Sequence, residues 1–403
     1  MSEKFIPVLM GNDINVYSMA RAFHQEYGLK SFVFCKSISG PCNNSSILEL
    51  KADPKMDTTE VFLTNINAFA KEHSNLKIVL IGCGDSYVEV ISKNLNNLEK
   101  NIIAPYMEFE KIEPLTDKKT FYEVCAANGI DFPATFTYEK DTPRDSELGF
   151  GAPYIIKPSD SVEYWRYPFE GQNKVFLVDT KEELVSTVNK IFNAGYSKGI
   201  IIQEFIPGDD TNMRVLTSYS DKNGKVKLMA LGHVLLEEHT PKGIGNHAVI
   251  LNEYNKELYE KYKSLLENLN YIGFSNFDIK YDERDGKYKA FEINPRQGRS
   301  NFYVTNSGYN LAKMVVDEYI NNKDSNETIM VSNEKLWMMV PKKVAFKYIK
   351  PEKYKTAMKK LILEGNYVNP LFYSEDKVLK RNLSIFKSQM SHFVKYKKYL
   401  GDK

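Results

Sequence analysis

Two neighbouring strand-like segments carry the residues of this sequence that are best suited to chemistry. Residues 277–301 read FDIKYDERDGKYKAFEINPRQGRSN, and the polar turn DERDG separates two alternating segments. Strand alternation places Glu292, Asn294 and Arg296 on one face, and cross-strand pairing brings Asp278 near Glu292. Two carboxylates and an amide carbonyl form a cluster of hard oxygen donors, which suits Mg²⁺. The segment therefore predicts a magnesium site.

Two arginines, Arg296 and Arg299, follow this cluster. A guanidinium can hold a phosphate or a carboxylate through two parallel hydrogen bonds. A magnesium ion held by one or two carboxylates leaves its other positions to water and nucleotide phosphates. A charged hairpin with surface ion pairs is the alternative interpretation, and it would suffice for any one of these residues alone. The combination predicts a nucleotide phosphate on one side and an anionic acyl group on the other.

Two further segments read as buried strands that end in polar residues. The segment PYIIKPSD (153–160) delivers Lys157, and a lysine that ends a buried strand needs a partner anion. The segment GIIIQEFIPGDD (199–210) delivers Gln203 and Glu204 before a Pro-Gly turn. These residues are further candidates for the same site.

Residues 1–112 alternate strand and helix signals. An apolar run before Gly11, helical spacing after Asn12 and Asp13, and the same pattern at 77–94 predict strand, tight turn and helix. Such alternation predicts a parallel sheet with helices on both faces. The glycine turns lack a full G-x-G-x-x-G pattern, so a tight turn without a dinucleotide is favoured. Asp13 could still point at a ligand, because such sheets bind ligands at their carboxyl edge.

Length and composition exclude several classes of protein. A chain of 403 residues suggests two or three domains, and 42% apolar and 26% charged residues are globular values. The formal net charge is +2 and no nucleic-acid-binding motif appears, so nucleic acid is not an expected partner. The four cysteines form no C-x-x-C pair, which disfavours zinc and favours a reduced, cytoplasmic setting. No segment resembles a signal peptide or an apolar membrane span.

The composition turns basic from residue 334 onward. Residues 334–403 hold seventeen Lys and Arg against six Asp and Glu, with Tyr and Phe interleaved among the lysines. Solvated helix faces with aromatic residues packed inward are the favoured interpretation. The alternative is a basic surface for an anionic substrate or for membrane headgroups, with peripheral membrane contact as its consequence.

The order of these elements resembles the ATP-grasp superfamily over residues 1–310. These ligases join a carboxylate to a nucleophile through an acyl phosphate. FEINPRQGRSN resembles the metal strand of the family, and this match is the most specific one. The resemblance implies ATP and one or two Mg²⁺ ions, with Mn²⁺ as an alternative ion. It implies metal ligation by Asp278, Glu292 and Asn294.

The resemblance also assigns nucleotide-binding roles. DKKTFYEVCAANGIDFPATF resembles the opening of the ATP-binding part, which places the first phosphate lysine at Lys118, with Lys119 as a near competitor. YIIKPSD places the second at Lys157, on the α and β phosphates. IIQEFIPGDD resembles the hinge strand, and the implied adenine contacts and ribose acid are Gln203, Glu204, Ile206 and Asp210.

One segment departs from the family pattern. Many members have a glycine-rich flap after the second lysine, whereas PSDSVEYWRYPFEGQNK has only Gly171. Ser159, Ser161 and their backbone amides are left to cover the phosphates. The departure puts the mobility of the flap in doubt, but not the fold.

The implied mechanism forms an acyl phosphate, which an amine then attacks through a tetrahedral oxyanion. Arg296 or Arg299 is expected to stabilise that charge, and Arg214 could do so from the other side. The sequence shows no evident general base. Three histidines of one strand-loop segment could line the site, although a surface or packing role is favoured for each: His233, His239 and His247.

Two segments, FIPVLMGNDINVYSMARAFHQEYG and KPSDSVEYWR, resemble bacterial D-aspartate ligases within the superfamily. Those enzymes phosphorylate the β-carboxylate of D-aspartate and attach it to the lysine side-chain amine of the peptidoglycan precursor stem peptide. Another amino acid or carboxylate is an alternative donor, and a non-catalytic nucleotide-binding module is an alternative function. An anionic cell-wall precursor would suit the basic C-terminal segment, and a homodimer is the base-rate expectation.

The expected architecture is mixed α/β and α+β, an ATP-grasp fold whose two lobes enclose ATP. The sequence divides into a Rossmann-like N-terminal domain, a small lobe, a large lobe with the metal site and a basic C-terminal extension. Their predicted bounds are 1–112, 113–205, 206–333 and 334–403.

Overall fold

The computed structural model describes residues 5–241, 243–323 and 327–401, without the side chains of residues 161 and 162. The chain forms two compact units. Unit 1 comprises Met1–Ile112, Asp210–Asp278 and Ile293–Lys403, and unit 2 comprises Glu113–Asp209 and Ile279–Glu292. Unit 1 thus combines the N-terminal part, most of the expected large lobe and the C-terminal segment. The division of the sequence into four domains stays a prediction.

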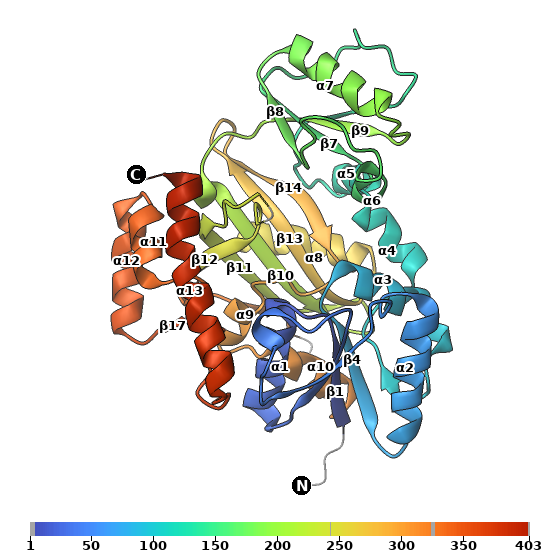
Figure 1. Cartoon of the computed structure of the whole chain (residues 1–403), viewed down its shortest axis with the longest axis vertical. Helices are drawn as coiled ribbons and strands as arrows, with labels where there is room; N and C mark the ends of the chain where they lie inside the picture. The colour runs from blue at the N-terminus through green and yellow to red at the C-terminus, as the bar shows by residue number, and fades with distance from the viewer. Residues whose placement is uncertain (1–4, 242, 324–326, 402–403) are drawn as a thin grey trace. The chain divides into compact units, whose positions relative to one another are not determined.

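Unit 1 begins with a five-stranded parallel sheet in the order β3-β2-β1-β4-β5 (Figure 1). Its strands are β1 (Phe5–Met10), β2 (Ser31–Cys35), β3 (Leu48–Ala52), β4 (Lys77–Gly82) and β5 (Ile102–Ile103). Helices follow β1, β3 and β4, namely α1 (Ile14–Tyr27), α2 (Thr59–Glu72) and α3 (Asp85–Lys93). Every residue of β1 and all but the first of β4 are buried, as expected for strands covered on both faces. This confirms the parallel sheet predicted for the N-terminal part of the chain.

Helix α1 begins directly after the tight turn of β1. The carboxylate of Asp13 caps the helix by accepting a hydrogen bond from the amide of Asn15 (2.9 Å), and Gly28 closes it in the left-handed conformation. Gly11 has a φ of 134°, which residues with a side chain rarely adopt, and a Cβ there would lie 2.8 Å from Val16. The turn therefore fixes Asp13 at the carboxyl end of β1.

The large sheet has eight strands, in the order β14-β13-β10-β11-β12-β16-β17 with β15 beside β11. They are β10 (Met213–Ser220), β11 (Val226–Glu237), β12 (His247–Glu253), β13 (Gly273–Asp282), β14 (Lys287–Asn294), β15 (Ile329–Met330), β16 (Leu336–Met338) and β17 (Tyr367–Val368). The helices between them are α8 (Lys256–Asn268), α9 (Phe302–Asn306) and α10 (Leu311–Tyr319). The boundary between the two units crosses β13 after Asp278 and β14 after Glu292.

The basic C-terminal segment is built into unit 1. Trp337 of β16 is fully buried, and helices α11 (Lys342–Tyr348), α12 (Glu352–Leu363) and α13 (Leu379–Leu400) lie side by side (orange and red in Figure 1). Arg381 forms a buried ion pair with Asp376 (3.0 Å), whose carboxylate also accepts hydrogen bonds from the hydroxyls of Ser45 and Ser46. The segment therefore belongs to the core of the unit.

Unit 2 is built on a four-stranded antiparallel sheet in the order β6-β9-β7-β8. Its strands are β6 (Thr135–Tyr138), β7 (Tyr154–Pro158), β8 (Phe176–Val178) and β9 (Ile200–Glu204). The chain enters through α4 (Phe109–Thr116), and the helices of the unit are α5 (Lys118–Ala127), α6 (Ser161–Tyr164) and α7 (Lys181–Asn193). Apolar residues of α7, including Leu184, Val188 and Ile191, pack with Ile156 and Ile202 of the central strands. This core supports the ends of β7 and β9, where polar residues collect.

Candidate active site

The first predicted phosphate lysine lies at the start of α5. Asp117 caps this helix by accepting hydrogen bonds from the amides of Lys119 and Thr120. Lys118 is half-buried and its Nζ lies 3.1 Å from Glu292 Oε2, whereas Lys119 is exposed. Unit 2 thus brings a predicted phosphate lysine together with a predicted metal ligand. This arrangement favours Lys118 over Lys119 as the residue that faces a ligand.

A chain of hydrogen bonds joins the two lysine segments. Lys157 Nζ donates to Gln203 Oε1 (2.9 Å), because the two residues are diagonal neighbours on one face of β7 and β9. Gln203 Nε2 donates to the hydroxyl of Tyr122 (2.8 Å), which itself donates to the carbonyl of Phe291 (3.0 Å). Tyr122 is absent from the predicted set. Its spacing of four residues from Lys118 on one helix face is the signal that could have found it.

The ammonium of Lys157 is hydrogen-bonded to a neutral group and not to an anion. Burial, and after it the charge of Lys118, lowers the pKa of Lys157 to about 7, against the opposing effect of Glu292. Gln203 offers the ammonium only a neutral oxygen. A group in this state gains strongly from an anion, because an anion stabilises its charged form. The surroundings of Lys157 therefore fit a phosphate.

The carboxylate of Glu204 is engaged in a network of ion pairs. Its oxygens lie 2.9 Å from Lys289 Nζ and 2.9 Å from a guanidinium nitrogen of Arg284, and both cations also contact the buried Asp282. Burial alone would raise the pKa of Glu204, but the amide of Ala134 and the two cations outweigh it and lower the pKa. The network stabilises the end of β9. The carboxylate of this predicted adenine contact thus has a structural role.

The segment after the second lysine is held by bonds within unit 2. The amide of Ser159 donates to the carbonyl of Gly199 (3.0 Å), and its hydroxyl lies 3.3 Å from that of Tyr196. The amide of Asp160 also donates to Tyr196 (3.0 Å). The side chain of Ser161 lies outside the described residues. The amide and hydroxyl that Ser159 would offer to a phosphate therefore have partners in this conformation.

The remaining predicted nucleotide contacts follow β9. Ile206 is buried, and its carbonyl accepts a hydrogen bond from Lys280 Nζ (2.9 Å). Asp210 Oδ2, in unit 1, accepts hydrogen bonds from the amide of Glu237 (2.9 Å) and lies 2.8 Å from His239 Nε2. The carboxylate predicted to take the ribose hydroxyls thus contacts the loop that follows β11.

Two of the predicted metal ligands belong to unit 1. Asp278 Oδ1 lies 3.9 Å from His247 Nε2. Asn294 ends β14, where its Oδ1 accepts a hydrogen bond from Arg296 (3.0 Å) and its amide nitrogen donates to the carbonyl of Asn276 (3.4 Å). Asp278 on β13 and Asn294 on β14 thus stand on neighbouring strands of the large sheet, as the sequence predicts.

His247 is the histidine of the predicted strand-loop segment that lies beside a metal ligand. Its Nε2 also lies 4.0 Å from Glu237 Oε1. Burial, followed by the charge of Arg299, lowers the pKa of His247 to about 4, against the opposing effect of Asp210. The imidazole is therefore neutral near pH 7, where it is a polar neighbour of Asp278 and a weak base.

Both arginines that follow the metal strand reach acidic residues at the carboxyl edge of the parallel sheet. Arg296 binds the two oxygens of Asp85 (2.7 and 3.2 Å), and Arg299 Nε lies 3.2 Å from Asp13 Oδ2. Burial alone would lower the pKa of Arg296, but the nearby acids, Asp85 first, outweigh it and raise the pKa. Asp85 is absent from the predicted set, although it follows β4 as Asp13 follows β1.

Arg214, the third predicted arginine, is nearly buried in unit 1. Its guanidinium forms an ion pair with Glu253 and donates to the carbonyls of Thr211 (2.9 Å) and Met213 (3.0 Å). His233, opposite Arg214 on β11, lies 3.7 Å from the same carboxylate. These contacts hold the start of β10, and the predicted catalytic role of Arg214 stays a prediction.

A buried polar cluster fixes the loop that carries the two arginines. Asn15, at the start of α1, donates to the carbonyl of Gln297 (2.8 Å) and accepts from the side chains of Gln297 (3.1 Å) and Asn301 (2.8 Å). All three side chains are fully buried. The loop of residues 295–301 is therefore held against α1 by hydrogen bonds that have no alternative in water. Sequence reasoning missed these residues, because nothing in their spacing marks the contact.

Replacement of Asn15 by Ala is expected to weaken this cluster and the catalytic reaction together. The change leaves two buried amide groups without their acceptor, which should lower the free energy of unfolding by about 2 kcal/mol. Turnover should fall by about tenfold or more, because Arg296 and Arg299 lose their support. Nucleotide affinity should stay within about twofold, since the phosphate lysines belong to unit 2. Urea unfolding, equilibrium nucleotide binding and steady-state kinetics measure the three quantities.

Asn310→Ala is the matched control for this prediction. Asn310 is also buried, donates to the carbonyl of Ala22 (2.9 Å) and caps α10. The Asn310→Ala variant should lose a similar free energy of unfolding and keep its turnover. Equal losses of turnover in the two variants would mean that the cluster around Asn15 has no specific role in the reaction.

The predicted metal ligands offer the donor chemistry of a hard cation. Throughout the described ranges 5–241, 243–323 and 327–401, no three His, Cys, Asp or Glu side chains gather as a metal site. The predicted set has only two side chains of these four types, because its third member is an amide: Asp278, Glu292 and Asn294. Such a set suits Mg²⁺, which keeps its other positions for water and phosphate oxygens.

Comparisons with known proteins agree on one family. The family described as ATP-grasp domain matches residues 115–300. The chain is 40% identical over 409 residues to the D-aspartate ligase of Enterococcus faecium (strain Aus0004), a match that covers 99% of this chain and 97% of that protein.

Solved structures show the same fold at low identity. The crystal structure of L-amino acid ligase from Bacillus licheniformis matches with a TM-score of 0.57 and 17% identity, over 79% of this chain and 74% of that chain. The structure of N5-carboxyaminoimidazole synthetase from Staphylococcus aureus complexed with ADP matches with a TM-score of 0.62 and 14% identity, over 90% of this chain and 87% of that chain.

Proposed function

We propose that this chain, which belongs to the ATP-grasp family of carboxylate–amine ligases, joins the β-carboxylate of D-aspartate to the lysine side-chain amine of a peptidoglycan precursor stem peptide. The predicted ATP-grasp fold is confirmed. The choice of D-aspartate is supported by the nearly full-length likeness to the enterococcal ligase. The ATP-dependent chemistry is supported above all by one arrangement: Lys157 Nζ binds the neutral amide oxygen of Gln203, and Lys118 pairs with Glu292 in the same unit.

Unit 2 would hold the phosphates of ATP. Lys157 gains a counter-charge from the α and β phosphates, and Lys118, released from Glu292, contacts the phosphate chain. The adenine edge would lie at the hinge formed by Gln203, Glu204 and Ile206, with Glu204 acting through the position of its strand. Ser159 would cover the phosphates after exchanging its present partners, and Asp210 would take the ribose hydroxyls.

Asp278, Glu292 and Asn294 would hold Mg²⁺, or Mn²⁺ in its place. The ion supplies charge neutralisation for the triphosphate. The hard oxygens of these three side chains fit it, and Lys118 occupies the position of a counter-cation beside Glu292 in the present conformation. With Glu292 holding the ion, Lys118 would be free to contact the phosphates.

The edge of the parallel sheet would hold the amino acid donor. Two ion pairs lie there, Arg296 with Asp85 and Arg299 with Asp13. An amino acid needs one acid for its ammonium and one cation for its α-carboxylate. The β-carboxylate attacks the γ-phosphate of ATP, which gives an acyl phosphate and ADP. The amine then attacks the acyl carbon and phosphate leaves. Arg296 and Arg299 stabilise the oxyanion and the departing phosphate, and water must be excluded until the amine arrives.

A substrate panel tests the assignment. Phosphate release from Mg-ATP is measured with each D- and L-amino acid alone, and then with amine acceptors. Release is expected with D-aspartate, and it should rise with a lysine-containing stem-peptide precursor. The product should carry an amide between the β-carboxylate and the lysine amine, which mass spectrometry of the peptide fragments locates.

Release with a different carboxylate would leave the ligase chemistry in place and overturn the D-aspartate assignment. If ATP binds but no donor and acceptor pair gives phosphate release, both the ligase chemistry and the D-aspartate assignment are contradicted. The four cysteines are free and buried, which supports a reducing compartment such as the cytoplasm as the place of this reaction.

A further inference from the structure

Helix α13 packs one face against unit 1 and exposes apolar residues on another face. Its inward residues recur every three or four positions and are buried: Arg381, Ile385, Gln389, His392 and Tyr396. Its outward face carries large hydrophobic residues at the same spacing, with exposed fractions from 36% to 71%: Leu379, Leu383, Phe386, Met390, Phe393 and Val394. We call this second set the apolar stripe of α13. Six large hydrophobic residues exposed along one face of a single helix mark an interaction surface.

The inward contacts fix which side of the helix faces out. Tyr396 donates its hydroxyl hydrogen to the carbonyl of Glu237 (2.7 Å), and Gln389 donates to the carbonyl of Met339 (2.7 Å). At the first turn, Arg381 is paired with the buried Asp376. A rotation that hid the apolar stripe would break all three contacts, so the stripe is presented to the outside by the packing of unit 1.

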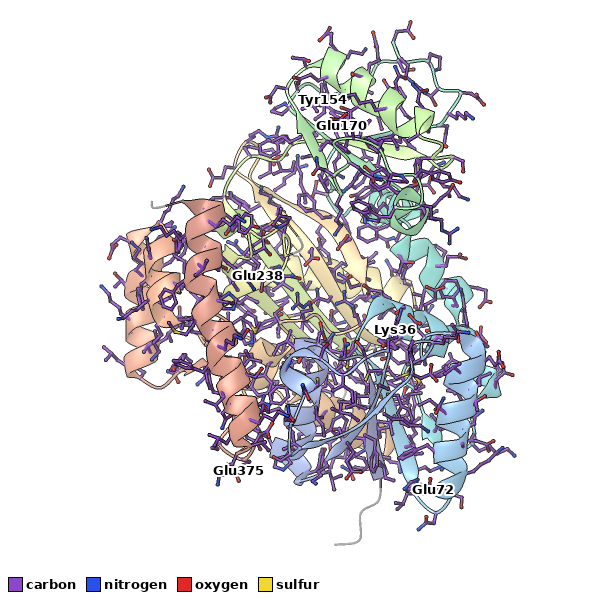
Figure 2. The ribbon with its side chains drawn as sticks, in the orientation of Figure 1. Lys36, Glu72, Tyr154, Glu170, Glu238 and Glu375 are labelled. Carbon is purple, nitrogen blue, oxygen red and sulfur yellow. The ribbon has the colours of Figure 1, made fainter. Side chains whose placement is uncertain are left out.

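The charges of α13 are all of one sign. Its sequence, LKRNLSIFKSQMSHFVKYKKYL, contains no Asp or Glu, and its exposed cations are Lys380, Lys387, Lys395, Lys397 and Lys398. Figure 2 shows Glu375 beyond the first turn and Glu238 on the side toward β11, where Glu238 lines a small cavity with Lys395 and Tyr396. These two acidic neighbours therefore do not neutralise the outward face.

We propose that the apolar stripe of α13 docks on the surface of an anionic lipid bilayer. A helix with an apolar face and flanking lysines lies in the interface plane, with its apolar residues in the headgroup and acyl boundary and its lysines at the headgroups. The absence of acids from the helix matches the negative potential of such a surface. No helix of the described part of the chain is long and apolar enough to cross a membrane.

The same charges argue against a second copy of the chain as the occupant. Two such helices packed stripe to stripe would place lysines beside lysines, and neither helix has an acid with which to pair them. Like charges in that position oppose association. An anionic surface instead satisfies the apolar stripe and the lysines at once.

Vesicle binding of the full-length chain, without ATP or substrates, tests the proposal independently of the reaction. Co-sedimentation with vesicles of phosphatidylglycerol and phosphatidylcholine should be at least about tenfold stronger than with phosphatidylcholine alone, and it should weaken as salt is added. The double variant L383E/F386E should lose at least about tenfold of the binding, because it removes apolar area and adds negative charge. The neutral variant Phe386→Ser should lose about threefold or more.

The double variant S384E/S388E is the matched control, since it adds the same charge at exposed positions of α13 outside the stripe. It should lose clearly less binding than L383E/F386E. Equal losses in the two double variants would overturn insertion of the stripe, as would equal binding to both kinds of vesicle. The proposal would be overturned in favour of self-association if the unmodified chain did not bind vesicles but formed a dimer, and if L383E/F386E dissociated that dimer.

Discussion

Replacement of Glu292 by Gln is expected to reduce ATP-dependent phosphate release by at least about 100-fold. The amide removes one of the two carboxylates of the proposed metal site, and the triphosphate loses the charge neutralisation that phosphoryl transfer needs. The Mg²⁺ concentration that gives half-maximal turnover should rise in parallel. Lys118 and Glu292 are partly exposed, so the loss of their ion pair should change the free energy of unfolding by less than about 1 kcal/mol.

Glu257→Gln, the same chemical change on the exposed side of α8, should leave phosphate release and its Mg²⁺ dependence at the level of the unmodified chain. Metal titrations of the two variants and the unmodified chain, followed by phosphate release, make the comparison. Turnover of Glu292→Gln within about threefold of that of Glu257→Gln would remove Glu292 from the metal site.

Local periodicity explains why much of the site could be predicted. Period-two alternation places Glu292 and Asn294 on β14, and a polar turn separates this strand from Asp278 on β13. Lys157 lies in the predicted buried strand that the structure shows as β7, next to the predicted strand β9. Each of these placements depends on residues that are close in sequence, where strand and turn preferences act.

The supporting partners of these residues depend on the tertiary fold instead. Asp85 and Arg296 are 211 residues apart in sequence, and Asn15 and Gln297 are 282 apart. No spacing rule connects positions so distant, and a single sequence offers no other source for such a contact. The ion pairs that occupy Glu204 have the same origin, since Lys289 is 85 residues away.

The C-terminal segment shows the same limit for secondary structure. Strands β16 and β17 have three and two residues, which is too short for any alternation to be recognised. The sequence of this region therefore reads as a basic extension. In the structure, both strands extend the large sheet, and the ion pair of Arg381 with Asp376 is buried in unit 1.

This arrangement decides how the basic segment has to be tested. Deletion of residues 334–403 would remove two strands of the large sheet and expose the apolar core residues that Trp337 packs with. Loss of function after such a deletion would report on folding, because the removal of a core element destabilises the unit that contains it. Substitutions confined to the outward face of α13 keep the core and isolate the role of the surface.

Binding of Mg-ATP is expected to take up a proton at Lys157. The pKa of this lysine is lowered to about 7 in the free protein, chiefly by burial, and phosphates at the ammonium should raise it again. At pH 8 the free protein carries about one tenth of a proton at this site and the complex about one, whereas at pH 6 both are protonated. By linkage, the affinity for Mg-ATP should fall as the pH rises above 7, by up to about tenfold per unit until the pKa of the complex is reached.

Calorimetry in buffers with different ionisation enthalpies measures this uptake directly, and three variants separate its origin from other titrations. Lys157→Met should lose both the proton uptake and at least about tenfold of the affinity, because the cation that would contact the phosphates is removed. Lys157→Arg should bind without uptake, since a guanidinium stays protonated at pH 8. Lys198→Met, at an exposed position of the same unit, should behave as the unmodified chain. Uptake that persists in Lys157→Arg would assign the proton to another group, and the absence of uptake in the unmodified chain would mean that Lys157 keeps its charge before the nucleotide arrives.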